Sequence, residues 1–469
     1  MYDFLEYVLS LLGRGLLLAG LAAVFGGLVL AVVYGIHRKR HGKEKPFPWG
    51  RTLLYFLLAG YLAVLGYATL MRQSWGIREI SFHPLRAWME AWNDFSFKSW
   101  ANVLLNVALF VPAGFLLPLL WKKLRKWNRA IPAGFALSMG IELLQLALAR
   151  GVCDVDDLIA NTLGATLGFF LVMALLGIRN RRQCFTYAGL ALGLVAVLAL
   201  PFGLYEMKTY GNLPDAPAYR LNTSKTQWTL DCELPQSPET VPVYRTETMS
   251  KSECAEMYRF FADMSGSDQS VESYYQEMAY YNLNPGGILQ VYYHDGSWEY
   301  LGPGHWDYNF GNPEAEKPQW KAWTRERVEA ALAPYPFSIP AKAEFLSEGD
   351  GWYRFSCDRL KILDTLWDGT LRCRLTPEGE VMEIIQKLIP FTYHSDAEIL
   401  PAEAAWQKLQ KGWFKDNLGY TYRPPTQVTA TACVLSYTVD TKGFYQPVWE
   451  FTLTSDNGFS GTVMIPAVR

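Results

Sequence analysis

The chain has 469 residues, a formal net charge of −2 and 19% charged residues, and its mean hydropathy is +0.01. These averages exclude a strongly basic nucleic-acid-binding protein. They also hide two unlike halves: long apolar runs dominate residues 1–204, whereas residues 205–469 hold most of the charged and proline residues. The seven cysteines form no C-x-x-C pair, so neither a zinc site nor a thioredoxin-like motif is expected. We expect no cofactor.

Six apolar segments in the first half are long enough to cross a bilayer, which needs about 20 residues. In chain order they are residues 15–36, 51–70, 101–121, 130–149, 158–177 and 184–204. Asp3 and Glu6 precede the first segment in place of the basic start of a signal peptide, so we expect it to be retained. The first half is therefore predicted to be a membrane all-α domain of six transmembrane helices, residues 1–204.

The short loops between these segments predict the orientation. Residues 37–45, 122–129 and 179–182 are strongly basic, whereas residues 71–100 and 150–157 are acidic or mixed. Basic loops stay in the cytoplasm. The N-terminus and everything after Leu204 are then predicted to lie outside.

Polar residues interrupt three successive segments near their predicted outer ends, although a charged group at a helix centre costs about 3 kcal/mol. They are Asn102 and Asn106, then Glu142 and Gln145, then Asp154, Asp156, Asp157 and Asn161, with Arg150 in the preceding loop. Spacings of three or four residues place members of each group on one helix face. Two interpretations stay open: a structural hydrogen-bond network with helix capping by Asp154 and Asp156, or a polar pocket that binds a headgroup, with Arg150 at its rim. Both predict that the three helices touch.

Small residues continue the polar face of the fifth segment. Ala160, Gly164 and Gly168 follow one another at intervals of four residues. This small-xxx-small pattern lets another helix approach closely.

Three stretches together resemble one known family. They are Asn102–Phe115 (NVLLNVALFVPAGF), Glu142–Gln145 (ELLQ) and Arg150–Gly164 (RGVCDVDDLIANTLG), and their order and spacing resemble the VanZ-like membrane proteins over about residues 50–180. The resemblance implies a multi-pass protein of the bacterial cell membrane. The founding member of that family is associated with resistance to teicoplanin, a lipid-anchored glycopeptide that acts at the outer membrane surface. The family has no established catalytic residues to carry over.

Residues 205–469 are predicted to form an extracytoplasmic α+β domain with an antiparallel sheet, and a division into subdomains at about 205–335 and 336–469 is one option. The expected strands are 287–293 and 298–301 around a His294–Ser297 turn, 351–357, 371–375, 381–389, 427–437 and 444–453; the expected helices are 250–264, 320–333 and 395–413. Cys357 and Cys373 lie on neighbouring predicted strands and are candidates for a disulfide. The last helix and strands faintly resemble PepSY-type and YycI-like extracytoplasmic modules.

Three functions remain in view. The first is a non-enzymatic envelope protein that binds or shields a lipid headgroup or a lipid-anchored envelope molecule at the outer leaflet, with no nucleic-acid partner. The second is an enzyme that modifies an envelope lipid, with Glu142 or Asp157 as acid/base and Asp154, Asp156 and Asp157 as weak metal candidates. The third is a sensor whose tail reads an external signal, which needs a membrane-protein partner.

Overall fold

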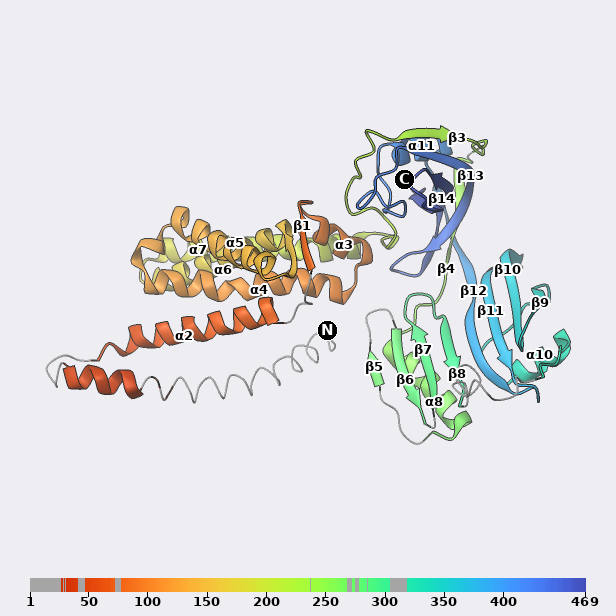
Figure 1. Ribbon diagram of the computed structural model, residues 1–469, viewed down its shortest axis with the longest axis horizontal. Coiled ribbons are helices and arrows are strands. Elements are labelled where there is room, and N and C mark those ends of the chain that lie inside the picture. Colours follow the sequence, from red (N-terminus) through yellow and green to blue (C-terminus); the bar gives the residue numbers. More distant parts are fainter. Residues whose placement is uncertain are drawn as a thin grey trace. The chain divides into compact units, whose positions relative to one another are not determined.

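The computed structural model describes residues 27, 29, 31–40, 47–71, 77–236, 238–267, 272–274, 278–284, 286–303 and 319–469. The chain divides into two compact units. The first comprises Met1–Trp92 and Phe97–Met207, and the second comprises Asn93–Ser96 and Lys208–Arg469. Helices dominate the first unit and strands dominate the second (Figure 1).

The described part of the first unit holds five helices that are long and apolar enough to cross a membrane. They are α2 (Trp49–Gly66, continued by the π-helical turn η1, Tyr67–Met71), α4 (Phe97–Leu120), α5 (Trp127–Ala147), α6 (Val155–Leu176) and α7 (Arg181–Met207). These helices match the second to sixth predicted segments. Most of the first predicted segment, 15–36, lies outside the described residues.

Helix α6 is the central helix of this unit, because it packs against α4, α5 and α7. Half of its apolar span is buried inside the protein, compared with 6% of the spans of α2 and α7. The predicted small residues explain its approach to α4: a Cβ atom on Gly164 would lie 1.9 Å from the Val107 carbonyl oxygen, and one on Gly168 would lie 2.0 Å from that of Val111. The small-residue prediction is therefore confirmed, and the partner helix is α4.

Two short loops of the first unit meet in a parallel pair of strands that the sequence did not predict. Strand β1 (Ile77–Ser81) pairs with β2 (Arg150–Asp154), which leads directly into α6. The nine-residue helix α3 (Arg86–Asp94) follows β1, and α4 begins at Phe97. The structure thus orders the acidic loop 150–157 together with the segment before α4.

The second unit is built on one large sheet, with 13 strands in its described part. The strands are β3 (Gln227–Leu230), β4 (Thr240–Arg245), β5 (Glu272–Tyr274), β6 (Met278–Leu283), β7 (Gly287–Tyr292), β8 (Trp298–Leu301), β9 (Glu344–Gly349), β10 (Trp352–Ile362), β11 (Thr365–Leu375), β12 (Val381–Glu398), β13 (Gln427–Val439), β14 (Phe444–Ser455) and β15 (Ser460–Pro466). Their main order is β3-β13-β14-β4-β12-β8-β7-β6-β5; β11, β10 and β9 branch from β12, and β15 pairs with β14. Apart from the parallel pair β3–β13, the neighbours are antiparallel, as predicted.

Two hydrophobic cores lie on this sheet. The first surrounds α8 (Lys251–Ser265) and α10 (Arg325–Leu332), and its buried members run from Cys254 to Leu388. The second surrounds α11 (Ala402–Gln410). Its buried members are Leu221, Val241 and residues between Ile399 and Ala467. The first core has buried members on both sides of residue 335, and the division of this unit into subdomains stays a prediction. The long strand β12 connects the two cores, since it pairs with β8 and β11 first and with β4 near its end.

The predicted helices of the tail are present, but two begin later than expected. Helix α8 carries a capping box between Ser250 and Glu253. Helix α10 begins at Arg325 rather than at 320, and α11 begins at Ala402 rather than at 395 because β12 continues to Glu398. The proposed disulfide is absent: Cys373 lies opposite Tyr353, Cys357 lies opposite Gly369, and both thiols are free.

Candidate binding site in the membrane unit

Polar side chains of α4, α5 and α6 meet where α5 ends and α6 begins. Ser138 lies one turn before Glu142 on α5, and its hydroxyl accepts a hydrogen bond of 2.9 Å from the Asn161 amide on α6. The Asn106 amide on α4 donates to an Asp157 carboxylate oxygen on α6 at 2.5 Å. These two bonds confirm that the three helices touch.

Glu142 is a carboxylic acid inside the helix bundle, with only 2% of its surface exposed. One of its oxygens accepts a hydrogen bond of 3.3 Å from the backbone N–H of Asp154, at the start of α6. The Asp157 carboxyl group on α6 is near that of Glu142. A second acidic group thus lies beside a buried one, an arrangement that is costly unless donors or cations compensate it.

Gln145 lies one turn beyond Glu142 on α5 and is only 3% exposed. One of its two polar amide atoms has a hydrogen-bond partner among the described residues, and the other has none. Its amide nitrogen donates to the Thr69 carbonyl in η1 at 2.9 Å. A carbonyl can only accept, so this bond establishes which end of the amide is the oxygen. The Gln145 Oε1 atom is buried and has no hydrogen-bond partner among the described residues. Asn161 likewise has one amide atom without a partner there.

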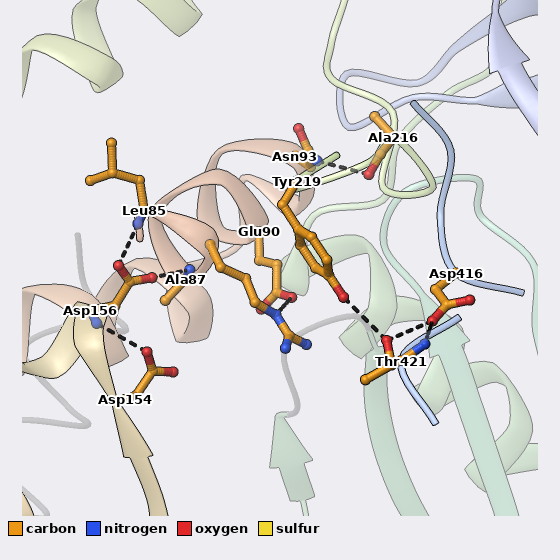
Figure 2. A network of polar contacts seen from close by, with 11 residues as sticks. Leu85, Ala87, Glu90, Asn93, Asp154, Asp156, Ala216, Tyr219, Asp416 and Thr421 are labelled. Atoms are coloured by element: carbon orange, nitrogen blue, oxygen red, sulfur yellow. Dashed lines mark hydrogen bonds and ion pairs between the residues drawn. The ribbon is translucent and has the colours of Figure 1, made fainter. Parts of the chain in front are cut away.

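Asp154 caps α6, as one of the two interpretations predicted, whereas the Asp156 side chain binds the backbone at the start of α3. Asp154 accepts from the backbone N–H of Asp156 at 3.0 Å and is the N-cap of α6. Asp156, 2% exposed, accepts from the backbone N–H groups of Leu85 at 2.5 Å and Ala87 at 2.6 Å, at the start of α3 (Figure 2). Each oxygen of Asp156 therefore accepts from a backbone donor, which ties the start of α6 to the start of α3.

Two further predicted site residues are Asn102 and Arg150. Asn102 is exposed on α4, one turn before Asn106, and is not part of the described hydrogen-bond network. Arg150 pairs through its backbone with Ile77 in the β1–β2 pair, and its side chain lies outside the described residues. Among the described residues, no group of three or more His, Cys, Asp or Glu side chains could hold a metal ion.

Residues 52–177 match the family model of VanZ/LLP1. Over these residues the membrane unit is similar to that family. The match runs from the start of α2 to the end of α6, so it includes every polar residue of the site and both glycines that face α4. No curated protein and no solved structure matches the chain. The resemblance of the tail to PepSY-type and YycI-like modules stays a prediction.

The VanZ-like site is rich in hydrogen-bond acceptors. Glu142 and Asp157 supply carboxylates, and Gln145 supplies an amide oxygen to which no described residue donates. Ser138 was missed from the sequence, although it lies four residues before Glu142 and therefore on the same helix face. The arrangement can bind a group that carries N–H or O–H hydrogens.

Proposed function

We propose that the VanZ-like unit is an envelope binding protein that takes a donor-bearing headgroup at the outer leaflet. The headgroup belongs to a membrane lipid or to a lipid-anchored glycopeptide, and its capture weakens drugs such as teicoplanin. The observation that carries the proposal is the buried Oε1 atom of Gln145, which has no partner among the described residues and lies one turn from Glu142 on α5.

An unpaired buried acceptor costs about 1–3 kcal/mol, so a group that donates to it gains that amount on binding. Bonds from an ammonium to a carboxylate are roughly twice as strong as neutral ones. The site therefore favours amines and hydroxyls over phosphates. A purely structural network is the competing account, in which ordered water supplies the missing donor.

The chain direction supports placement of the site on the outside. Helix α4 starts, α5 ends and α6 starts at the end of the bundle where the site lies. The basic segment η2 (Lys122–Arg125) connects the opposite ends of α4 and α5. Because basic loops favour the cytoplasm, the site then faces the other side.

Binding by the purified full-length protein in lipid nanodiscs tests this proposal. We expect teicoplanin to bind, and vancomycin, which lacks the lipid anchor, to bind at least about tenfold more weakly, because the anchor adds buried apolar surface. Gln145→Met and Glu142→Gln should each weaken teicoplanin binding by about 10- to 100-fold, the equivalent of one or two lost hydrogen bonds to a charged group.

Glu206→Gln is the matched control, because Glu206 is an exposed carboxylate near the C-terminal end of α7. It should leave the affinity unchanged. The headgroup can also come from a membrane lipid. Native mass spectrometry of lipid that copurifies with the same variants tests this source. The proposal would be contradicted if the parent and all variants bound teicoplanin and vancomycin equally and also retained equal amounts of copurified lipid.

The neighbouring carboxylates of Glu142 and Asp157 also favour the second candidate, an enzyme that modifies an envelope lipid. General acid–base catalysis is worth about 10²- to 10⁴-fold in rate. Glu142→Gln should then abolish turnover of the lipid while it is still bound. A binding protein shows the opposite pattern, in which the variant loses affinity and no modified lipid forms with either protein.

A further inference from the structure

Helix α3 has an apolar face that the described protein covers only in part: Trp88 and Trp92 are half-buried, whereas Leu85 and Met89 are exposed. Trp88, Met89 and Trp92, together with Leu85 just before the helix, fall on one side at intervals of three and four residues. Leu85 is 52% and Met89 is 40% exposed. The other side carries polar groups, such as the ion pair between Arg86 and Glu90 at 2.8 Å.

Large apolar side chains flank this helix on both sides. Ile80 and Phe82 precede it and are 49% and 77% exposed, and Phe97, the first residue of α4, is 43% exposed. A soluble surface rarely gathers so many exposed apolar groups in one segment. Here the segment continues directly into a transmembrane helix, since only Phe95 and Ser96 separate α3 from α4.

Aromatic rings mark the same level of the bundle. Trp92 contacts Tyr205 edge to face, with ring centroids 6.4 Å apart, and Trp100 packs on Phe202 at 4.8 Å. These rings come from α3, the first turn of α4 and the last turns of α7. Trp and Tyr are enriched at the interface between membrane and water. This group of rings therefore indicates that α3 lies at that interface.

Helix α3 is attached to the start of α6. Asp156 binds the backbone at the start of α3 (Figure 2), and Ala91 on the inner side of the helix is fully buried. The open face of α3 is thus an ordered surface.

We infer that residues 80–97 form an interfacial membrane anchor: α3 lies along the membrane surface, with Phe82, Leu85 and Met89 in the lipid of the leaflet where α4 begins. The occupant of the apolar face is lipid, since the face is continuous with the lipid-facing surface of the spans. An amphipathic helix of this kind buries its apolar side to the boundary between headgroups and acyl chains. This anchor holds whether or not the polar site below it binds a headgroup.

Photo-crosslinking in the full-length protein tests this inference. A benzophenone amino acid is placed at Phe82, at Met89 or at Glu90, and the protein is reconstituted in phosphatidylglycerol/phosphatidylethanolamine vesicles. Glu90 follows Met89 in the chain and lies on the polar face of α3, so it is the control for a face turned away from lipid. The same amino acid at Val195 on α7, which is 46% exposed, gives the yield expected of a lipid-facing residue.

We expect lipid adducts at Phe82 and Met89 with a yield close to that at Val195 and about fivefold or more above that at Glu90, because an interfacial helix turns one face to lipid. Equal lipid yields at Met89 and Glu90 would overturn the inference. So would crosslinks from Phe82 and Met89 that join the probe to protein rather than lipid, since they would show that a part of this chain or another copy covers the face.

Discussion

Replacement of Gly164 by alanine is expected to cost the membrane unit at least about 3 kcal/mol, at the upper end of the effect of overpacking a core. The new Cβ would lie 1.9 Å from the Val107 carbonyl oxygen, so the backbones of α4 and α6 must separate. Helix association in a membrane rests on such close contacts. The measurement is the free energy of unfolding in mixed micelles.

Gly140→Ala on α5 is the control for this change. A Cβ on Gly140 meets nothing within 4 Å, so the same substitution should be neutral or should stabilise the helix by up to about 1 kcal/mol. Equal effects of the two substitutions would show that α4 and α6 are not in the contact described. Gly168→Ala, whose Cβ would lie 2.0 Å from the Val111 carbonyl oxygen, should behave like Gly164→Ala.

Asp156→Asn is expected to detach the start of α3 and to cost roughly 2–4 kcal/mol, because two charge-assisted bonds to backbone N–H groups are weakened. An amide has one acceptor oxygen, so only one of the N–H groups of Leu85 and Ala87 keeps a partner. Hydrogen exchange at Leu85 and Ala87 measures the local effect, and the melting temperature measures the global one.

The matched change is Asp154→Asn, two residues earlier. Asp154 is the N-cap of α6, and asparagine is as good an N-cap as aspartate, so this variant should stay within about 0.5 kcal/mol of the parent. If Asp156→Asn leaves exchange at Leu85 and Ala87 unchanged, the carboxylate does not hold α3.

The sequence predicted the membrane helices well because the signal is large. A span needs about 20 mostly apolar residues, and the five described helices are long and apolar enough on average. The helical repeat also placed Glu142 beside Gln145 and Asp157 beside Asn161, since spacings of three and four residues share a face. Asn102 is exposed although Asn106, one turn later, bonds to Asp157, so its place in the site stays a prediction.

Contacts between distant backbone groups left no trace in the sequence. Asp156 binds the backbone of Leu85 and Ala87, about 70 positions away, and any residue type at those two positions offers the same N–H. The parallel pairing of β1 with β2 is of the same kind. In the tail, the hairpin at His294–Ser297 was predictable from local turn chemistry, but the course of β12 through both cores depends on pairings with β4, β8 and β11 that lie far apart in the chain.

The most direct test of the central claim is the teicoplanin susceptibility of a sensitive bacterial host that expresses the full chain, compared with the Glu142→Gln/Asp157→Asn double variant and the Glu206→Gln control at matched membrane levels. If the site binds the drug's headgroup, the parent and the control should raise tolerance to teicoplanin by several-fold but not tolerance to vancomycin, and the double variant should lose the effect. A double variant that protects as well as the parent, or a parent that changes susceptibility to neither drug, would contradict it.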